Sequence, residues 1–206
     1  MTSTPPARPI EQGHGGERLP LLPVDRMDAD QRAAADALVN GPRKGVYGPF
    51  VPLLRHPPLL DRVAQLGQVL RFRGRLSADV RELVTSAVAS HVGNQFEWVM
   101  HVPLAQAAGV PAAALEAIRI RRAPSGLNEI QQLAFDFCQQ VLTQHEVTDG
   151  LYQRAVAAFG EDGVVELSTL IGYFAMVSWV MNVARTPSRP TADVAPLPDL
   201  QATDAI

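Results

Sequence analysis

The sequence contains very little cysteine and lysine. Cys138 is the only cysteine and Lys44 the only lysine in 206 residues. A single cysteine excludes a disulfide framework, a thiolate metal cluster and a Cys-x-x-Cys redox pair. Arginines scattered along the chain supply the other positive charges, and the net charge is -3. Nucleic-acid binding is therefore not expected.

Long hydrophobic runs are also scarce. The N-terminus lacks the apolar core of a secretory signal, so we expect a cytoplasmic protein. The one long uncharged run is 167–184, "LSTLIGYFAMVSWVMNVA", which is about as long as a membrane span needs to be. Serine, threonine and asparagine interrupt the run, and charged residues bracket it. We expect a buried helix of the core or of a subunit interface, and no membrane.

The two ends differ from the middle in composition. Residues 1–18 are rich in proline and glycine and offer little to bury, which predicts a flexible N-terminal segment. Residues 187–206 contain several prolines and little periodicity, which predicts a C-terminal tail. Residues 19–186 are long enough to form a single domain with a sizeable core.

Within residues 19–186, apolar residues recur at helical spacing and no alternating strand pattern is present. We expect an all-α domain with about seven or eight helices and no sheet. The expected helices cover 28–38, 58–73, 77–92, 94–108, 111–120, 128–142, 149–159 and 164–185. Residues 45–58 are expected to be an irregular connection.

The stretch "HVGNQFEWVMH", residues 91–101, concentrates polar groups that can do chemistry. Glu97 and His101 are four residues apart, so they project from one face of a helix. Asn94 lies one turn earlier, and His91 ends the preceding helix and can fold back over the same place. A carboxylate beside an imidazole makes a proton-transfer pair: the carboxylate raises the pKa of the ring, and partial burial moves both groups toward neutral pH.

The same residues also fit a purely structural interpretation. Asn94 and Glu97 have the spacing of a capping box, in which Glu97 would only bond the backbone of Asn94. His91 on an apolar face is more often a core histidine, and Trp98 is expected in the core or at the rim of a pocket. A metal site would need a third ligand that the spacing does not supply. Cys138 lies in the middle of an apolar helix and is expected to be inert.

Two longer segments carry a family resemblance, namely "LSADVRELVTSAVASHVGNQFEWVMHVPLAQAAGVPAAALEAI" and "GEDGVVELSTLIGYFAMVSWVMNV". With its Glu-Trp-x-x-His, the sequence resembles the carboxymuconolactone decarboxylase family, which shares its all-α fold with the alkylhydroperoxidase D proteins. The peroxidase branch carries Glu-x-x-Cys-x-x-Cys-x-x-x-His. These positions are His91, Asn94, Glu97 and His101 here, so the resemblance implies the branch without Cys-x-x-Cys and not a thiol peroxidase.

The resemblance also implies how such a protein works. Decarboxylase members of the family act without metal or organic cofactor, and the proteins assemble as dimers, trimers or hexamers. His101 would be the acid/base, with Glu97 orienting it or relaying the proton. The candidate substrate contacts are His91, Asn94, Trp98, Tyr173 and Asn182.

Two functions are therefore in competition. The first is a cofactor-free acid/base enzyme, a lyase that decarboxylates or rearranges a small cyclic or conjugated carboxylic acid or lactone. The second is a non-catalytic helical homo-oligomer, a scaffold or small-ligand binder in which the Glu-Trp-x-x-His motif is a helix cap. The direction of the Glu97 carboxylate separates them, because an enzyme needs it to face a cavity and a cap needs it to face the backbone.

Overall fold

The described part of the chain is all-α, which confirms the predicted fold class. The computed structural model describes residues 16–188 and 191–198, and no strand occurs among them. Residues 1–15, most of the expected N-terminal segment, lie outside the described residues, as do residues 199–206 of the expected tail. The helices within the described ranges are α1 (Ala29–Asn40), α2 (Phe50–Leu53), α3 (Pro57–Phe72), α4 (Ala78–Val92), α5 (Gln95–Ala107), α6 (Ala112–Arg119), α7 (Glu129–Gln144) and α8 (Asp149–Ala184), preceded by a 3-10 turn at Val24–Arg26.

Local sequence signals fix most of the helix ends. Asp28 and Asn128 each close a capping box, with Gln31 and Gln131 respectively. Gly93 ends α4 in the left-handed conformation, with a φ of 62°, which glycine adopts without steric cost. These signals act within a few residues, so the expected helices lie close to the observed ones.

Two regions differ from the expected pattern. The connection expected at 45–58 contains the short helix α2, whose residues Phe50, Val51 and Leu53 are buried. The helices expected at 149–159 and 164–185 are joined into the single long helix α8, which kinks at Gly160 with φ 76° and ψ 169°. The kink takes the place of the expected loop, because it changes the direction of the chain between two helical segments.

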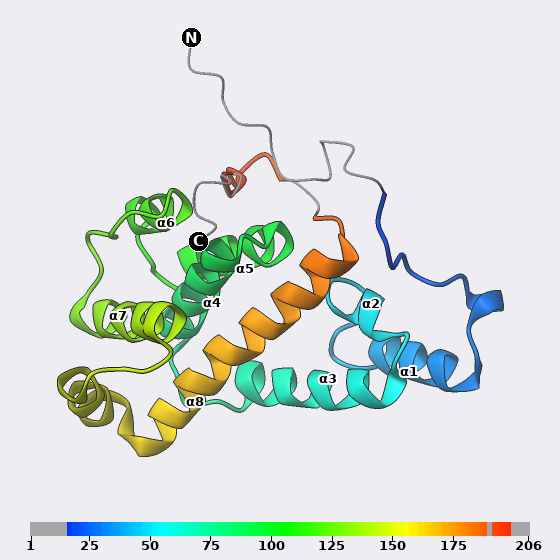
Figure 1. The fold of residues 1–206 in the computed structure, drawn as a ribbon, viewed down its shortest axis with the longest axis horizontal. Helices are drawn as coiled ribbons and strands as arrows, with labels where there is room; N and C mark the ends of the chain where they lie inside the picture. The colour runs from blue at the N-terminus through cyan, green and yellow to red at the C-terminus, as the bar shows by residue number, and fades with distance from the viewer. Residues whose placement is uncertain (1–15, 189–190, 199–206) are drawn as a thin grey trace, which may run out of the picture.

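The long helix α8 runs through the middle of the molecule (Figure 1). Helices α4, α5, α6 and α7 lie on one side of it, and α1, α2 and α3 lie on the other (Figure 1). Helix α4 contacts α5, α6, α7 and α8, and every residue from Glu82 to Ser90 is buried. The core therefore forms around α4 and α8, and polar side chains on α4 must find partners inside it.

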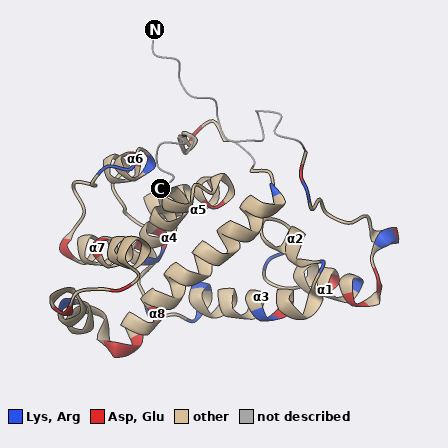
Figure 2. Ribbon diagram, viewed as in Figure 1, with Lys and Arg blue, Asp and Glu red and all other residues tan. Residues whose placement is uncertain are grey.

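Helix α8 is free of charge over its second half. Figure 2 shows this part in tan, whereas red and blue appear at its beginning and on α1 and α3. The apolar stretch is long enough to span a membrane, but half of it is buried inside this molecule. Its outer face exposes Val165, Trp179 and Val183.

The described part of the C-terminal segment packs on α5. Val194 and Leu197 are buried, and the indole Nε1 of Trp98 donates to the carbonyl of Ala195 at 2.9 Å. Gln95 bonds both backbone groups of Leu197. The segment 191–198 therefore packs against α5, and Val194 and Leu197 belong to the core.

Candidate active site

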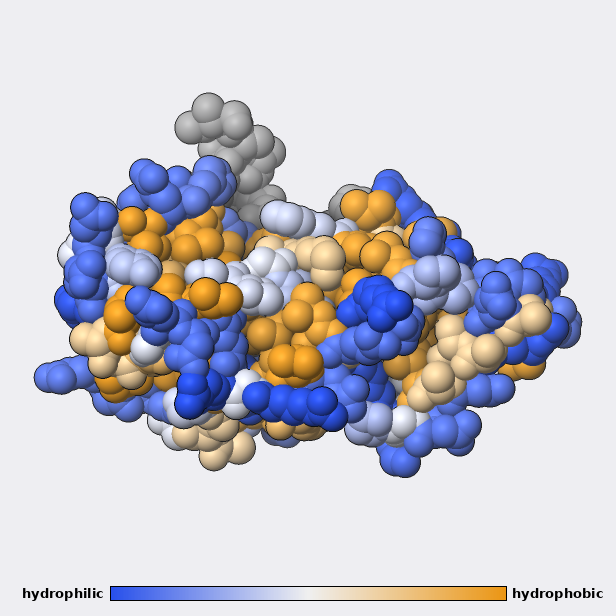
Figure 3. Space-filling model, turned by 90° about the horizontal axis from the view of Figure 1, so that it is seen from below, coloured by the Kyte–Doolittle hydropathy of each residue, from blue (hydrophilic) through white to orange (hydrophobic). Residues whose placement is uncertain are grey.

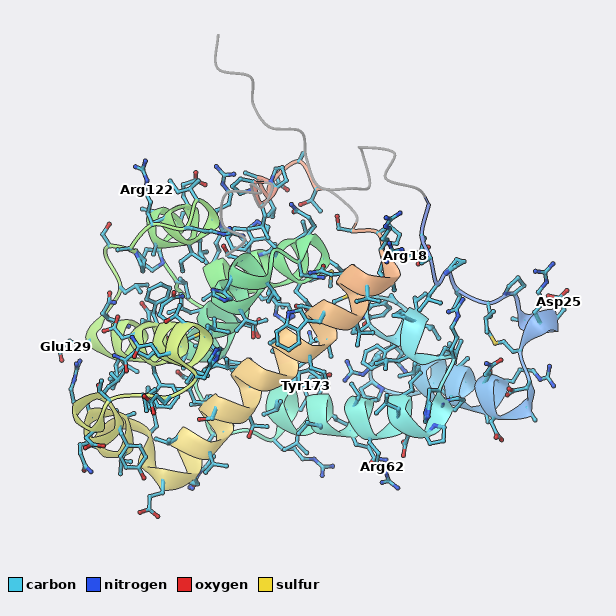
Figure 4. All side chains as sticks on the ribbon, viewed as in Figure 1. Arg18, Asp25, Arg62, Arg122, Glu129 and Tyr173 are labelled. Carbon is cyan, nitrogen blue, oxygen red and sulfur yellow. The ribbon has the colours of Figure 1, made fainter. Side chains whose placement is uncertain are left out.

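A cavity of about 70 Å³ lies among α3, α4, α5 and α8 and is bordered by the segment that leads into α2. It can hold a few waters or a small planar group. Its ionisable and polar lining residues are Arg43, Tyr47, Arg71, Arg81, Glu82, Thr85, Glu97, His101 and Tyr173. Its remaining walls are aliphatic and aromatic. Figure 4 shows Tyr173 on α8 in the middle of the molecule, with the other labelled side chains around the periphery.

His101 is held between two carboxylates at the wall of this cavity. Its Nδ1 lies 2.6 Å from Glu82 Oε2 and its Nε2 lies 3.1 Å from Glu97 Oε2. All three side chains are almost entirely shielded from solvent, at 12% exposure for His101 and 6% for each glutamate. The ring of Phe174 packs edge-on against the imidazole, with 5.0 Å between the ring centroids. Helix α4 supplies one carboxylate, and one turn of α5 supplies the other together with the imidazole.

This arrangement stabilises the positively charged imidazole. Burial disfavours the charge, but hydrogen bonds and charges of Glu82 and Glu97 outweigh it and raise the pKa of His101 to about 9. Burial likewise opposes ionisation of Glu82, yet His101 and the Arg81 guanidinium, 3.1 Å from Glu82 Oε1, hold the pKa of this carboxyl below its usual value. At neutral pH His101 is therefore an imidazolium that pairs with the Glu82 carboxylate on one side and contacts the Glu97 carboxyl group on the other. The sequence-based expectation of a histidine pKa near neutrality assumed one carboxylate, and the second one moves it upward.

The cluster predicts a stability maximum in mildly acidic solution. The raised pKa of His101 contributes stability that is fully present below its unfolded value of 6.5 and is lost as the pH rises through about 9. The lowered pKa of Glu82 contributes stability that is present above its unfolded value of 4.5 and is lost in acid. Urea unfolding should show the free energy of unfolding falling by on the order of 3 kcal/mol from pH 6.5 to 9. If His101→Gln shows the same alkaline fall, another group is responsible.

Glu97 does not close a capping box. The Asn94 side chain caps α5 by accepting from the Glu97 backbone N–H at 2.8 Å. The return bond is absent, because the Asn94 N–H donates to the Ala89 carbonyl and the Glu97 carboxylate faces His101. The helix cap and the proton-transfer pair are thus separate parts of the same stretch.

Asn94 and Asn182 bond each other and do not line the cavity. Asn94 Nδ2 donates to Asn182 Oδ1 at 2.8 Å and to the Ser178 carbonyl at 3.2 Å, and Asn182 Nδ2 donates to the Val92 carbonyl at 3.1 Å. The two amides join the start of α5 to α8. They therefore fix the position of Glu97 and His101 relative to Tyr173.

The structure also places His91 and Trp98 away from the cavity. His91 reaches solvent but lies in a separate depression with Arg121 and Arg122. Its partial burial there, together with the Arg121 charge, lowers its pKa. Trp98 is buried at 2% exposure and bonds the C-terminal segment. Of the candidate substrate contacts, Tyr173 alone lies at the cavity with Glu97 and His101.

Glu82 is the member of the site that sequence reasoning missed. It lies on α4 directly before Leu83 and Val84, which are both fully buried. One signal was present: Glu82, Thr85, Ser86 and Ser90 follow helical spacing in a segment whose other faces are apolar. Apolar residues on most of a helix, with small polar residues around one acid on the remaining face, indicate a helix that is buried on all sides. The acid then needs a buried partner.

The sequence model of the carboxymuconolactone decarboxylase family matches residues 57–140. This segment carries Glu82, Glu97 and His101, whereas Arg43 and Tyr173 lie outside it. No curated protein sequence matches the chain.

Three solved structures share the fold. The alkylhydroperoxidase AhpD core of an uncharacterized peroxidase-related protein from Ralstonia eutropha JMP134 is 15% identical, with a TM-score of 0.68 over 85% of this chain and 94% of that one. The protein of unknown function ATU0492 from Agrobacterium tumefaciens is 16% identical, with a TM-score of 0.59 over 68% and 96%. A cysteine-to-alanine variant of the debrominase Bmp8, in complex with 2,3,4-tribromopyrrole, is 11% identical, with a TM-score of 0.63 over 85% and 93%. At these identities the likeness establishes the fold.

No thiol lines the cavity. Cys138 lies on α7, is fully buried and does not line the cavity. Burial raises the pKa of the Cys138 thiol, so the reactive thiolate is disfavoured. The two ring nitrogens of His101 face carboxylates on opposite sides, and no group of three or more His, Cys, Asp or Glu side chains in the described residues is arranged to hold one metal ion. The groups at the cavity are suited to proton transfer.

Proposed function

We propose that this protein is a cofactor-free acid/base enzyme that decarboxylates or rearranges a small cyclic or conjugated carboxylic acid or lactone. The observation that carries the proposal is the buried row of Glu82, His101 and Glu97 at the wall of a cavity. Buried ionisable groups with displaced pKa values are concentrated at catalytic sites. The family of residues 57–140 supports a carbon-acid reaction of this kind.

His101 and Glu97 divide the proton transfer between them. Because His101 is protonated at neutral pH, it enters the reaction as the acid. In a decarboxylation, electrons left by carbon dioxide move into a conjugated carbonyl, and a ring carbon then takes a proton from the His101–Glu97 pair. In a rearrangement, the Glu97 carboxylate removes a proton from the carbon next to the carbonyl and His101 supplies one to the developing oxyanion.

Glu82 acts as a positioning residue. Its 2.6 Å contact with Nδ1 is short, as hydrogen bonds between charged groups are, and it fixes the ring so that Nε2 faces Glu97. Arg81 and the Thr85 hydroxyl, which bonds the Arg81 carbonyl at 2.9 Å, hold this part of α4. The carboxylate thereby keeps the imidazole oriented and charged between turnovers.

The non-catalytic alternative has less support. It expects the Glu97 carboxylate to bond the backbone of Asn94 and no cavity to reach His101. Here the carboxylate faces His101, and the cavity reaches both residues.

A substrate screen tests the proposal. Small cyclic and conjugated acids and lactones are incubated with the protein, and loss of conjugation is followed by ultraviolet absorbance and carbon dioxide by a coupled assay. Turnover that disappears in His101→Gln supports the proposal. Turnover that the variant retains would contradict it.

The exposed side of α8 supports a homo-oligomer. Val165 and Trp179 lie about four turns apart on one face, and Val183 follows one turn later; they are 65%, 58% and 65% exposed. Figure 3 shows further hydrophobic surface reaching solvent in the middle of the lower face of the single chain. Large apolar side chains exposed along one face of a helix are typical of protein interfaces.

Trp179→Glu is expected to reduce the assembled particle to a monomer, because it places a charge in the apolar contact. Sedimentation velocity measures the change. Tyr152→Glu is a matched control, since Tyr152 is an exposed aromatic residue on the same helix, outside the uncharged stretch. A monomeric unmodified protein would argue against the assembly, and equal effects of the two substitutions would argue against this interface.

A further inference from the structure

Arg43 is a cation at the cavity whose charge is not paired within the described chain. Arg81 pairs with Glu82, and the exposed Arg71 lies over the Phe72 ring. Arg43 takes part in none of the ion pairs formed by the described residues. A half-buried guanidinium without a carboxylate is costly to keep, which suggests that a ligand completes it.

The Arg43 side chain is held in place from three sides. Its Nη2 donates to the Ala64 carbonyl at 3.2 Å, and its guanidinium carbon lies 4.3 Å from the centre of the Phe50 ring. Its charge also acts on the buried phenol of Tyr173, whose pKa it lowers. A guanidinium fixed in this way loses little side-chain entropy when it binds an anion.

Gly67 on α3 provides the room for this pair. A Cβ at residue 67 would overlap the Tyr173 hydroxyl and lie 3.0 Å from Arg43 Nη2. Glycine within a helix costs about 1 kcal/mol relative to alanine. At this position it allows the Arg43–Tyr173 pair to reach the cavity wall.

Tyr173 connects this pair to the proton-transfer cluster. Burial raises the pKa of Tyr173 to about 12. The nearby Glu97 adds to this shift, and Arg43 opposes it. The phenol therefore stays protonated and can donate a hydrogen bond to an anion.

We propose that Arg43 and Tyr173 form a carboxylate-binding subsite, and that the carboxylate they hold is retained in the product. The guanidinium fork matches a planar carboxylate. A carboxylate that leaves as carbon dioxide must lose its negative charge, and an ion pair with Arg43 would stabilise the starting anion more than the transition state. A decarboxylated substrate therefore carries a second carboxylate, and a rearranged one needs a single carboxylate. The retention of this carboxylate in the product rests on the proposed acid/base function. The carboxylate-binding site itself does not.

Calorimetric titration with 2-furoate and with its neutral analogue 2-furamide tests the subsite without turnover. Furoate is expected to bind the unmodified protein more tightly than furamide. Arg43→Gln is expected to weaken furoate binding by roughly 10- to 100-fold, as loss of a charge-assisted hydrogen bond implies, and to leave furamide unchanged. Arg43→Lys keeps the charge without the fork. Its affinity for furoate should therefore lie between those of the unmodified protein and Arg43→Gln. Arg71→Gln is the matched control, because it removes a charge from the exposed edge of the same cavity.

Several outcomes would overturn the subsite. They are no saturable furoate binding, equal affinity for furoate and furamide, or equal weakening by Arg71→Gln and Arg43→Gln. Thermal unfolding shows whether Arg43→Gln is folded, and Arg43→Lys replaces it if it is not. Furoate binding that persists in His101→Gln while turnover is unaffected by that substitution would refute the acid/base function and leave the subsite standing.

Discussion

Replacing His101 by glutamine is expected to lower turnover by roughly two to four orders of magnitude. Glutamine can still accept and donate hydrogen bonds between Glu82 and Glu97, so the helical fold should persist. It cannot carry the proton that His101 holds at neutral pH. Glu97→Gln should cause a similar loss, because the proton then has no carboxylate to move to or from. Steady-state rates with the substrate found by screening measure both effects.

His91→Gln is the matched control for this result. His91 belongs to the same eleven-residue stretch, but it is exposed and lines a different depression. Its replacement is expected to change turnover by no more than about twofold, the ordinary scale of a surface substitution. A loss in His91→Gln as large as that in His101→Gln would move the active site to the other end of α4. Undiminished turnover in both variants would remove the stretch from the mechanism.

Features that depend on interactions within a few residues were predictable from the sequence. The capping boxes at Asp28 and Asn128 and the left-handed Gly93 were predictable because each acts within one turn. The Glu97–His101 pair was predictable for the same reason, since residues four apart share a helix face. Tyr173 and Asn182 were named as candidate substrate contacts, but the residues that they contact in the structure were not predicted.

For the longer-range contacts, no local signal identified the partner residue. Glu82 is 19 residues before His101, and only the packing of α4 against α5 brings them together. Arg43 precedes Tyr173 by more than 100 residues, and Gly67 on α3 leaves the room for them to meet. Asn182 bonds Asn94, a pairing that depends on how α8 crosses α5. Hydrophobic periodicity predicts which face of a helix is buried, but not which helix covers it.

Removing the Glu82 carboxylate is expected to produce the largest loss of stability of any single change at the site. Glu82→Ala leaves the Nδ1 of a buried imidazole and the neighbouring Arg81 without their partner, and breaking a buried charge pair in this way costs about 3 kcal/mol. Urea unfolding at pH 6, where the pair is fully formed, measures the loss. Glu116→Ala is the control, because Glu116 also pairs with an arginine but is exposed, and exposed pairs contribute less than about 1 kcal/mol.

The isosteric variant Glu82→Gln separates positioning from simple packing. Its amide oxygen can still accept from Nδ1, so most of the stability should remain, but the negative charge is gone. The pKa of His101 should fall below its value of about 9, because one of the two carboxylates that raise it is lost. Titration of the imidazole carbon-bound protons by NMR measures this directly, and the alkaline limb of the rate profile should move to lower pH by the same amount. An unchanged His101 titration in Glu82→Gln would show that Glu97 alone sets the charge of the imidazole, and Glu82 would then be a packing residue of α4.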